Sequence, residues 1–262
     1  MNGTPPNRPI LSARGLSKHY SSRRGCLDID LDIYEGEVLA LAGESGSGKS
    51  TLLGLLSTQL ECSSGSLSYV RSDGVEVDLR AMTEMERRFL LRTEWGFVQQ
   101  EARLGLRMKV SAGGNVGERL MAVGWRNYGA IRREAGEWLQ RVEIDPARMN
   151  DIPETFSGGM RQRLQIARNM VTNPRLVFMD EPTGGLDVSV QARLLDLLRS
   201  LVAERGLAVV IVTHDLSVAR LLSHRIAIMR HGGIVETGLT DQVLDDPQHA
   251  YTQLLVSSVL QV

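Results

Sequence analysis

The sequence is short of lysine and of cysteine. Only three of its 30 basic residues are lysine (Lys18, Lys49 and Lys109), so each lysine can be considered singly. The only cysteines, Cys26 and Cys62, cannot build a disulfide framework, and no Cys-x-x-Cys pair is present. A reducing compartment is therefore the simplest interpretation.

A long apolar run and a basic excess are also missing. The longest stretch without Asp, Glu, Lys or Arg is 247–262, which is too short and too polar to span a bilayer. Residues 1–9 lack the apolar core of a signal peptide. The 30 basic residues are balanced by 31 acidic ones, which argues against a general nucleic-acid binder. We therefore expect a cytoplasmic chain without nucleic-acid partners and without direct membrane insertion.

Short apolar segments alternate with helical patterns along the 262 residues. Segments 38–42, 176–179 and 207–212 are apolar throughout, which is typical of strands buried on both faces. A helical pattern follows each of them, and residues 101–167 have a mainly helical pattern of their own. The sequence therefore predicts an α/β fold with a mainly parallel sheet and an inserted helical subdomain.

A glycine-rich loop follows the first of these strands and precedes a helix. It fits GxxxxGK[ST] and consists of Gly43, Glu44, Ser45, Gly46, Ser47, Gly48, Lys49 and Ser50, with Thr51 directly after it. Small residues let the backbone curl so that N–H groups and a helix N-terminus face a phosphate chain. Lys49 is predicted to reach the β- and γ-phosphates and Ser50 to bind Mg²⁺. The competing interpretation is a flexible Gly/Ser turn.

Two acids end the strand over residues 176–179. Asp180 is suited to hold Mg²⁺, directly or through water, and Glu181 to polarise an attacking water as a general base. The alternative is that both acids merely cap a turn before Pro182.

A third motif follows the helical region: Phe156, Ser157, Gly158, Gly159, Met160, Arg161 and Gln162. Together with the other two motifs it resembles the signature of ATP-binding-cassette (ABC) ATPases. The resemblance implies ATP and Mg²⁺ as cofactors. It also implies a head-to-tail dimer, in which Ser157, Gly158 and Gly159 of one copy close over the γ-phosphate held by Lys49 of the other. Met160 departs from the glutamine usual in the family.

The resemblance also implies a domain plan, an ABC-type P-loop NTPase with an N-terminal antiparallel β subdomain. Residues 1–9 are expected to form a flexible tail and 10–262 the ATPase domain. Within it we expect a nucleotide-binding core over 10–100 and 168–240, a helical subdomain over about 101–167 and a C-terminal helix over 241–262.

Four further positions match family landmarks. Tyr20 is placed like the aromatic residue that stacks on adenine, although a tyrosine is equally at home in a core. Gln100 resembles the glutamine that contacts Mg²⁺ and water, with Gln99 as the competing choice. Asp187 resembles the interface aspartate, and His214 the histidine that contacts the γ-phosphate.

The resemblance is closest to the ABC proteins of the bacterial carbon–phosphorus lyase system for phosphonate breakdown, through segments 92–96, 110–115, 117–121 and 177–199. It implies that the chain binds the subunits of the soluble lyase core complex and that ATP binding and hydrolysis change the conformation of that complex. Another ABC protein of the same system is a possible further partner. Residues 101–110, where importers receive their membrane subunit, are basic and free of proline. Two alternatives stay open: the ATP-binding subunit of an oligopeptide or dipeptide importer, suggested by Met160 and residues 246–252, and a nucleotide-gated binding module with little turnover.

Overall fold

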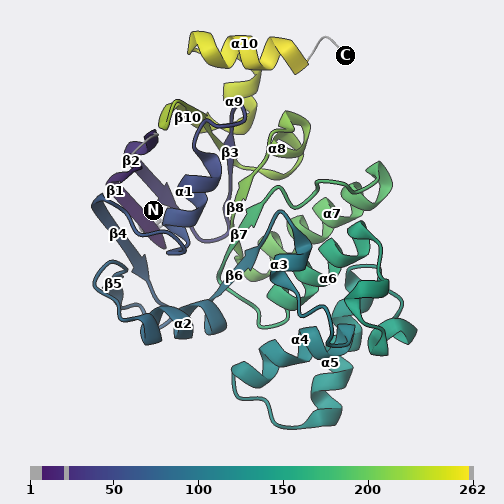
Figure 1. The fold of residues 1–262 in the computed structure, drawn as a ribbon. Coiled ribbons are helices and arrows are strands. Elements are labelled where there is room, and N and C mark those ends of the chain that lie inside the picture. Colours follow the sequence, from purple (N-terminus) through teal and green to yellow (C-terminus); the bar gives the residue numbers. More distant parts are fainter. Residues whose placement is uncertain (1–7, 21–23, 260–262) are drawn as a thin grey trace, which may run out of the picture.

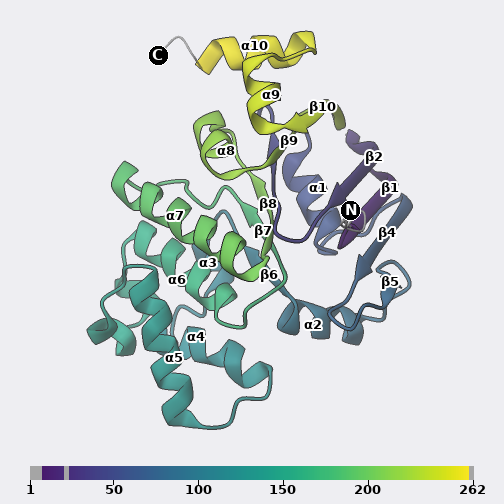
Figure 2. The ribbon, with the colours of Figure 1, turned by 180° about the vertical axis from the view of Figure 1, so that it is seen from behind.

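Two β-sheets and a set of helices make up the fold in the computed structural model, which describes residues 8–20 and 24–259. Residues 1–7 of the expected tail lie outside the described residues. The helices α4 and α5 form one end of the molecule, and α10 forms the opposite end (Figures 1 and 2). The elements that carry the three sequence motifs, α1, β7 and α6, lie between these two ends.

The strands form one antiparallel and one mainly parallel sheet. The first sheet has the order β2-β1-β4-β5, and the second has the order β10-β9-β3-β8-β7-β6. In the second sheet all neighbours are parallel except β10, which pairs antiparallel with β9 at one edge. The strands are β1 (Leu11–His19), β2 (Arg24–Ile33), β3 (Val38–Ala42), β4 (Ser64–Val70), β5 (Glu76–Asp78), β6 (Trp95–Val98), β7 (Leu176–Asp180), β8 (Ala208–Val212), β9 (Arg225–Arg230) and β10 (Gly233–Leu239).

Helices connect the parallel strands and form the inserted region. They are α1 (Lys49–Leu56), α2 (Glu84–Thr93), α3 (Ala102–Gly105), α4 (Ala112–Ala122), α5 (Tyr128–Arg141), α6 (Gly158–Met170), α7 (Val188–Arg205), α8 (Leu216–Leu222), α9 (Thr240–Asp245) and α10 (Ala250–Val259), with 3₁₀ turns at Pro146–Asn150 and Pro153–Thr155. The helix α6 continues through the expected boundary between residues 167 and 168. The end of the chain contains two helices, α9 and α10, where the sequence analysis expects one over 241–262.

The parallel sheet is covered on both faces, which explains its apolar strands. In β7, Leu176 and Phe178 pack with α1 and the antiparallel sheet, whereas Val177 and Met179 pack with the helices of the other face. The helix α1 therefore lies between the two sheets, and its N-terminus is fixed at the carboxyl end of β3.

Side-chain caps set where the two helices that carry the remaining motifs begin. The Ser157 hydroxyl accepts a hydrogen bond from the Met160 N–H at the start of α6. The Asp187 carboxylate accepts one from the Val190 N–H at the start of α7. Such caps satisfy N–H groups that have no partner within the helix. The helix α7 ends at Gly206, whose φ of 64° is left-handed.

Within residues 8–20 and 24–259, none of the helices has both the length and the apolar character needed to cross a membrane.

Candidate functional site

The loop between β3 and α1 has a conformation that requires glycine at its two ends. Gly43 has φ 141° and Gly48 has φ 108°. A Cβ atom on Gly43 would lie 2.3 Å from the Met229 carbonyl oxygen, which a side chain cannot tolerate. The spacing of the glycines in the motif thus reflects a backbone that curls tightly between β9 and the first turn of α1.

Lys49 holds this loop from inside. Its Nζ donates hydrogen bonds to the carbonyl oxygens of Gly43 at 2.7 Å and Glu44 at 2.8 Å, and the residue is only 7% exposed. Burial lowers the pKa of the Lys49 ammonium, and the carboxylates of Glu181, Asp180 and Glu44 oppose this shift. A buried cation that is bonded to neutral carbonyl oxygens is well prepared to meet a phosphate anion.

Ser50 and Asp180 lie side by side at the carboxyl ends of the sheet. The Ser50 hydroxyl donates to Asp180 Oδ1 at 3.3 Å. Burial raises the pKa of the Asp180 carboxyl; the Ser50 hydrogen bond opposes the shift and the neighbouring Glu181 adds to it. A hydroxyl and a partly buried carboxylate form the oxygen donor set that Mg²⁺ prefers, and the cation would relieve the repulsion between the two acids. The residues present therefore fit a magnesium ion.

Glu181 is held in an unusual backbone conformation. Its φ of 43° is left-handed for a residue other than glycine, and its N–H donates to the Val212 carbonyl oxygen at 3.0 Å. The Gln100 amide donates to Glu181 Oε2 at 3.0 Å, and His214 Nδ1 lies 3.1 Å from Oε1. Backbone strain of this kind persists where the surroundings fix it, often at functional sites. Side chains from two other segments thus converge on the Glu181 carboxylate.

Lys49, Ser50 and Glu181 line one open cavity of about 960 Å³, together with Gln100 and His214, whereas Asp180 contacts Ser50 and does not line it. Tyr20 lies there, 44% exposed, with the Lys18 Nζ 5.6 Å from its ring centroid. A Cβ atom on Gly25 would lie 2.9 Å from Tyr20 Cε2, so the ring packs closely over that glycine. The lining residues are Tyr20, Gly25, Ser45, Gly46, Gly48, Lys49, Ser50, Thr51, Gln100, Glu181 and His214.

Gln99 and Gln100 differ clearly in their surroundings. The Gln99 N–H donates to Gln165 Oε1 at 2.6 Å, and its carbonyl oxygen accepts from the side-chain amides of Gln162 and Gln165. The backbone at Gln99 is therefore fixed to α6, and the following residue, Gln100, is the one that lines the cavity. The helix that carries the third motif is thus connected directly to the segment that touches Glu181.

The third motif and Asp187 lie outside this cavity. Ser157 and Gly158 are exposed at the N-terminus of α6, and Asp187 is exposed at the N-terminus of α7. Hydrogen bonds from the Val190 N–H and the Ser189 hydroxyl lower the pKa of the Asp187 carboxyl. Within one chain, the structure does not bring these residues to Lys49. Met160, by contrast, is half-buried, and its sulfur accepts a hydrogen bond from Arg148 Nη1 at 3.3 Å.

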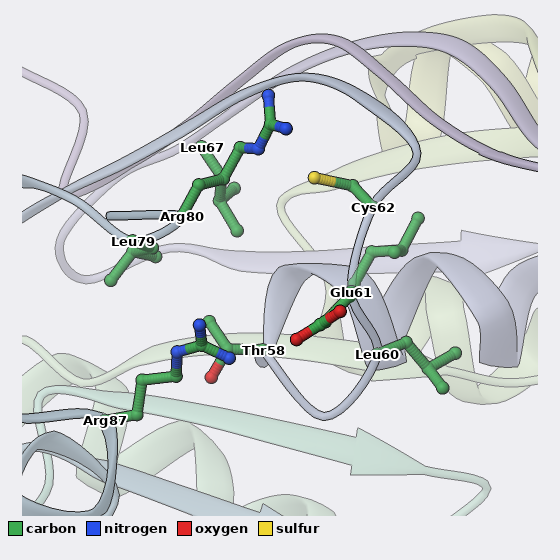
Figure 3. A pocket seen from close by; sticks show the side chains of 9 residues that line it. Thr58, Leu60, Glu61, Cys62, Leu67, Leu79, Arg80 and Arg87 are labelled. Carbon is green, nitrogen blue, oxygen red and sulfur yellow. The ribbon is translucent and has the colours of Figure 1, made fainter. Parts of the chain in front are cut away.

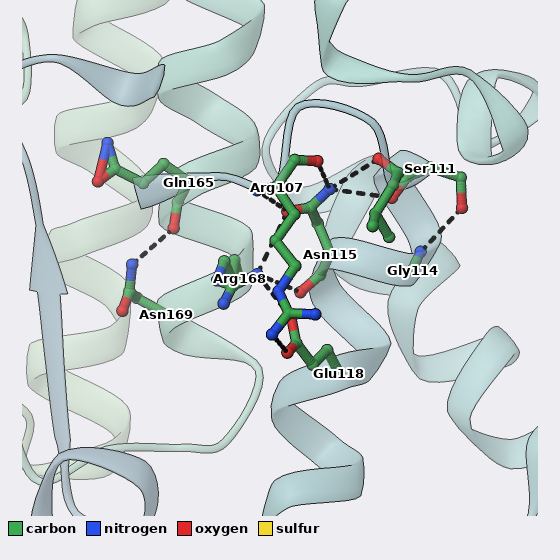
Figure 4. A network of polar contacts seen from close by, with 9 residues as sticks. Arg107, Ser111, Gly114, Asn115, Glu118, Gln165, Arg168 and Asn169 are labelled. Carbon is green, nitrogen blue, oxygen red and sulfur yellow. Dashed lines mark hydrogen bonds and ion pairs between the residues drawn. The ribbon is translucent and has the colours of Figure 1, made fainter. Parts of the chain in front are cut away.

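The segment after Gln100 is fixed to the helical region by a polar network (Figure 4). The buried Asn115 side chain accepts from the Arg107 N–H at 2.8 Å and donates to the carbonyl oxygens of Arg107 and Val110. Arg168 Nη1 lies 3.2 Å from both Asn115 Oδ1 and Glu118 Oε2. The rigid segment presents outward Leu104, which is 72% exposed.

A second cavity, of about 220 Å³, lies beside the end of α1 (Figure 3). Leucines dominate its lining, with Arg80, Arg87, Glu61 and the Cys62 side chain around them. Arg80 and Arg87 are each bonded to a backbone carbonyl, of Gly65 and Met82. None of its lining residues belongs to the motifs of the sequence.

Sequence reasoning missed two contributors to the site. Gly25 lines the cavity beneath Tyr20, and no local motif marks it. The hairpin of β9 and β10 closes around the loop, since the Gly232 N–H donates to the Ser47 carbonyl oxygen at 2.9 Å. The glycines at 232 and 233 indicate a hairpin in the sequence, but not what it touches.

Comparison with known proteins gives a consistent result. The profile of the ABC transporter family matches residues 26–184. A protein of Escherichia coli strain K12 that bears the name phosphonates utilization ATP-binding protein PhnK is 62% identical over 97% of this chain and 99% of its own length. A protein of Brucella ovis named for peptide import is 37% identical over 96% of this chain and 78% of its own length.

Solved structures confirm the expected fold. The ATP-binding cassette MJ0796, in a dimeric post-hydrolysis state bound to ADP and phosphate, has a TM-score of 0.81 and 29% identity, covering 88% of this chain and 99% of its own. A second dimeric structure of MJ0796, described as a bacterial ABC transporter cassette, gives the same TM-score with 30% identity.

Proposed function

Because the chain belongs to the ABC transporter family and is an ATP hydrolase, we propose that ATP hydrolysis by a head-to-tail dimer drives a conformational change in the soluble carbon–phosphorus lyase core complex. The setting is phosphonate catabolism in the cytoplasm. The observation that carries this proposal is the 62% identity, over nearly the whole length of both chains, to a protein named for phosphonates utilization. Identity to the peptide-import proteins compared is 34–37%.

ATP binding is assigned to the cavity at the carboxyl ends of the parallel strands. The adenine stacks on Tyr20, and Lys49 and the N–H groups of the loop residues that line the cavity, 45–46 and 48–51, bind the phosphates. Ser50, Asp180 and Gln100 would hold Mg²⁺, which would neutralise phosphate charge. Gly43, Glu44 and Ser47 do not line the cavity and serve as the backbone of the loop.

Glu181 is assigned as the general base for hydrolysis. Its carboxylate accepts a proton from the water that attacks the γ-phosphorus, and the bond between that phosphorus and the bridging oxygen breaks to give ADP and inorganic phosphate. Gln100 and His214, each within 3.1 Å of Glu181, orient the carboxylate and contact the water and the γ-phosphate. Phosphoryl transfer depends mainly on such positioning.

Dimerisation completes the site. The exposed N-terminus of α6 and the Ser157 hydroxyl favour an anion, yet neither lies at the cavity of its own chain. In a head-to-tail dimer, Ser157, Gly158 and Gly159 of one copy close over the phosphates bound by the other, and Asp187 lies at the interface. The dimeric MJ0796 structures support this arrangement.

The binding site for the lyase core is assigned to residues 101–110, the segment after Gln100. Leu104 is exposed, and the cationic residues Arg103 and Lys109 of the same segment are exposed as well. Because the segment continues from the residue that contacts Glu181, a partner bound there senses the state of the nucleotide site. A second ABC protein of the same system is a further proposed partner.

A peptide-type importer is the alternative function, because the same catalytic residues serve both. Purification of the native protein from cells growing on a phosphonate separates the two. We expect the soluble subunits of the lyase core to be recovered with it; recovery of a membrane permease instead would contradict the proposal.

A pair of leucine variants sharpens this test. Leu104→Arg is expected to lose at least 80% of the recovered lyase subunits, roughly the effect of losing a central apolar contact, while ATP hydrolysis by the chain alone is unchanged. Leu254→Arg, at a leucine that is 63% exposed on α10, is the matched control and is expected to retain them. If both variants recovered equal amounts of the lyase subunits, the segment that contains Leu104 would not be part of the interface.

A further inference from the structure

The C-terminal helix α10 contacts the phosphate loop. The Tyr251 hydroxyl, in the first turn of α10, accepts a hydrogen bond from the Glu44 N–H at 3.0 Å. The residue is only 3% exposed. Figures 1 and 2 show α10 at the end of the molecule, next to β10 and the carboxyl ends of the parallel strands. This contact joins positions separated by 207 residues.

Several contacts fix Tyr251 in this position. The Arg230 guanidinium lies over its ring, 4.8 Å from the centroid. The Tyr251 N–H donates to His249 Nδ1 at 3.1 Å. The Glu236 carboxylate, on β10, accepts from the N–H groups of Gln248 at 2.8 Å and His249 at 3.0 Å. The start of α10 is thus tied to the β9–β10 hairpin, and contacts within the chain hold the hydroxyl in place.

Tyr251 and Lys49 hold the same peptide unit from opposite ends. The Glu44 N–H and the Gly43 carbonyl belong to one planar peptide. Its N–H donates to Tyr251 at 3.0 Å, and its oxygen accepts from Lys49 Nζ at 2.7 Å. A rotation of this peptide would displace the carbonyl that positions the lysine. The orientation of the peptide, and with it that of the ammonium group, therefore depends on the tyrosine hydroxyl.

We propose that Tyr251 is a positioning residue for nucleotide binding, which acts through the peptide between Gly43 and Glu44 on Lys49. This inference rests on the proposed function, because it takes the cavity to bind the phosphates of ATP. It gives α10 a role in the nucleotide site: a change in the placement of α10 changes the affinity for ATP. No chemistry is assigned to Tyr251, since it does not line the cavity.

The test is Tyr251→Phe, which keeps the ring beneath Arg230 and removes only the hydroxyl. Loss of one neutral hydrogen bond is expected to raise the KM and the Kd for ATP by roughly 3- to 10-fold. The kcat is expected to stay within about twofold, because Glu181 and its partners are untouched. Tyr128→Phe, at an exposed tyrosine on α5, is the matched control and is expected to change neither constant.

Three results are decisive. An unchanged Kd for ATP in Tyr251→Phe, with normal binding by the parent, would overturn the inference and leave the proposed function intact. A fall in kcat and thermal stability together, at constant KM, would show a merely structural role and would also overturn it. Absence of ATP binding by the parent would defeat the proposed function itself and, with it, this inference.

Discussion

Replacing Glu181 with glutamine is expected to lower the rate of ATP hydrolysis by roughly 10²- to 10⁴-fold, the usual contribution of a general base. Glutamine has nearly the shape of glutamate and can still accept the Gln100 hydrogen bond, which is 3.0 Å long in the parent. The capacity to take a proton is lost together with the negative charge, while the shape of the side chain is kept. ATP affinity is therefore expected to change by less than about threefold.

Glu204→Gln supplies the control for this experiment. Glu204 is exposed on α7, and within the described residues its side chain forms no hydrogen bond or ion pair, so its replacement is expected to leave the rate unchanged. If Glu181→Gln hydrolysed ATP at the parent rate under saturating substrate, another group would have to be the base. A parent with negligible turnover even with its partner bound would instead favour a nucleotide-gated binding module.

Replacing Lys49 with alanine is expected to weaken ATP binding by roughly 10- to 100-fold. A hydrogen bond to a charged group contributes about 1.5–3 kcal/mol, and each 1.4 kcal/mol is a factor of ten in affinity. The buried ammonium also bridges the carbonyl oxygens of Gly43 and Glu44, so the loop loses an internal support. Titration of the variant with ATP, followed by calorimetry, measures the effect.

Lys109→Ala is the matched control, because Lys109 is exposed and distant in sequence from every residue of the phosphate loop. Its ATP affinity, measured on the chain alone, is expected to equal that of the parent. An affinity for ATP that is equally unchanged in Lys49→Ala would show that the phosphates bind elsewhere.

Much of the site could be predicted because its chemistry depends on residues close together in sequence. The curl from Gly43 to Ser50 and the acids that end β7 each need a short segment of fixed composition. Residues 176–179 of β7 are all apolar, which predicts that both faces of the strand are buried. In the structure alternate residues pack on the two opposite faces of the sheet. In these elements the local residue composition is sufficient to predict the local backbone geometry.

Long-range contacts could not be predicted in the same way. The hydrogen bond between Tyr251 and Glu44 joins residues that are 207 positions apart, and no periodicity shows it. The spacing favours Gln100 over Gln99, but the physical reason is that Gln162 and Gln165 hold the Gln99 backbone on α6. The break between α9 and α10 lies at Pro247. The carboxylate of Glu236 accepts a hydrogen bond from the Gln248 N–H there, and only the fold shows that β10 brings Glu236 to this place.

A second copy is expected to complete each site, and the mass of the particle formed with ATP measures this directly. Glu181→Gln with saturating ATP and Mg²⁺ is expected to have about twice the mass of one chain, 28.9 kDa, by light scattering. Adding Gly158→Arg is expected to keep the mass at that of one chain. A Cβ atom at Gly158 would have no other atom of its own chain within 4 Å, and the residue is exposed, so the arginine is expected to obstruct a partner rather than its own protomer.

Gly129→Arg, on the exposed start of α5, is the control in the same background and is expected to dimerise normally. We expect a doubled mass for Glu181→Gln alone and with Gly129→Arg, and a single-chain mass with Gly158→Arg. A doubled mass with Gly158→Arg, or a single-chain mass for Glu181→Gln at saturating ATP, would contradict this expectation.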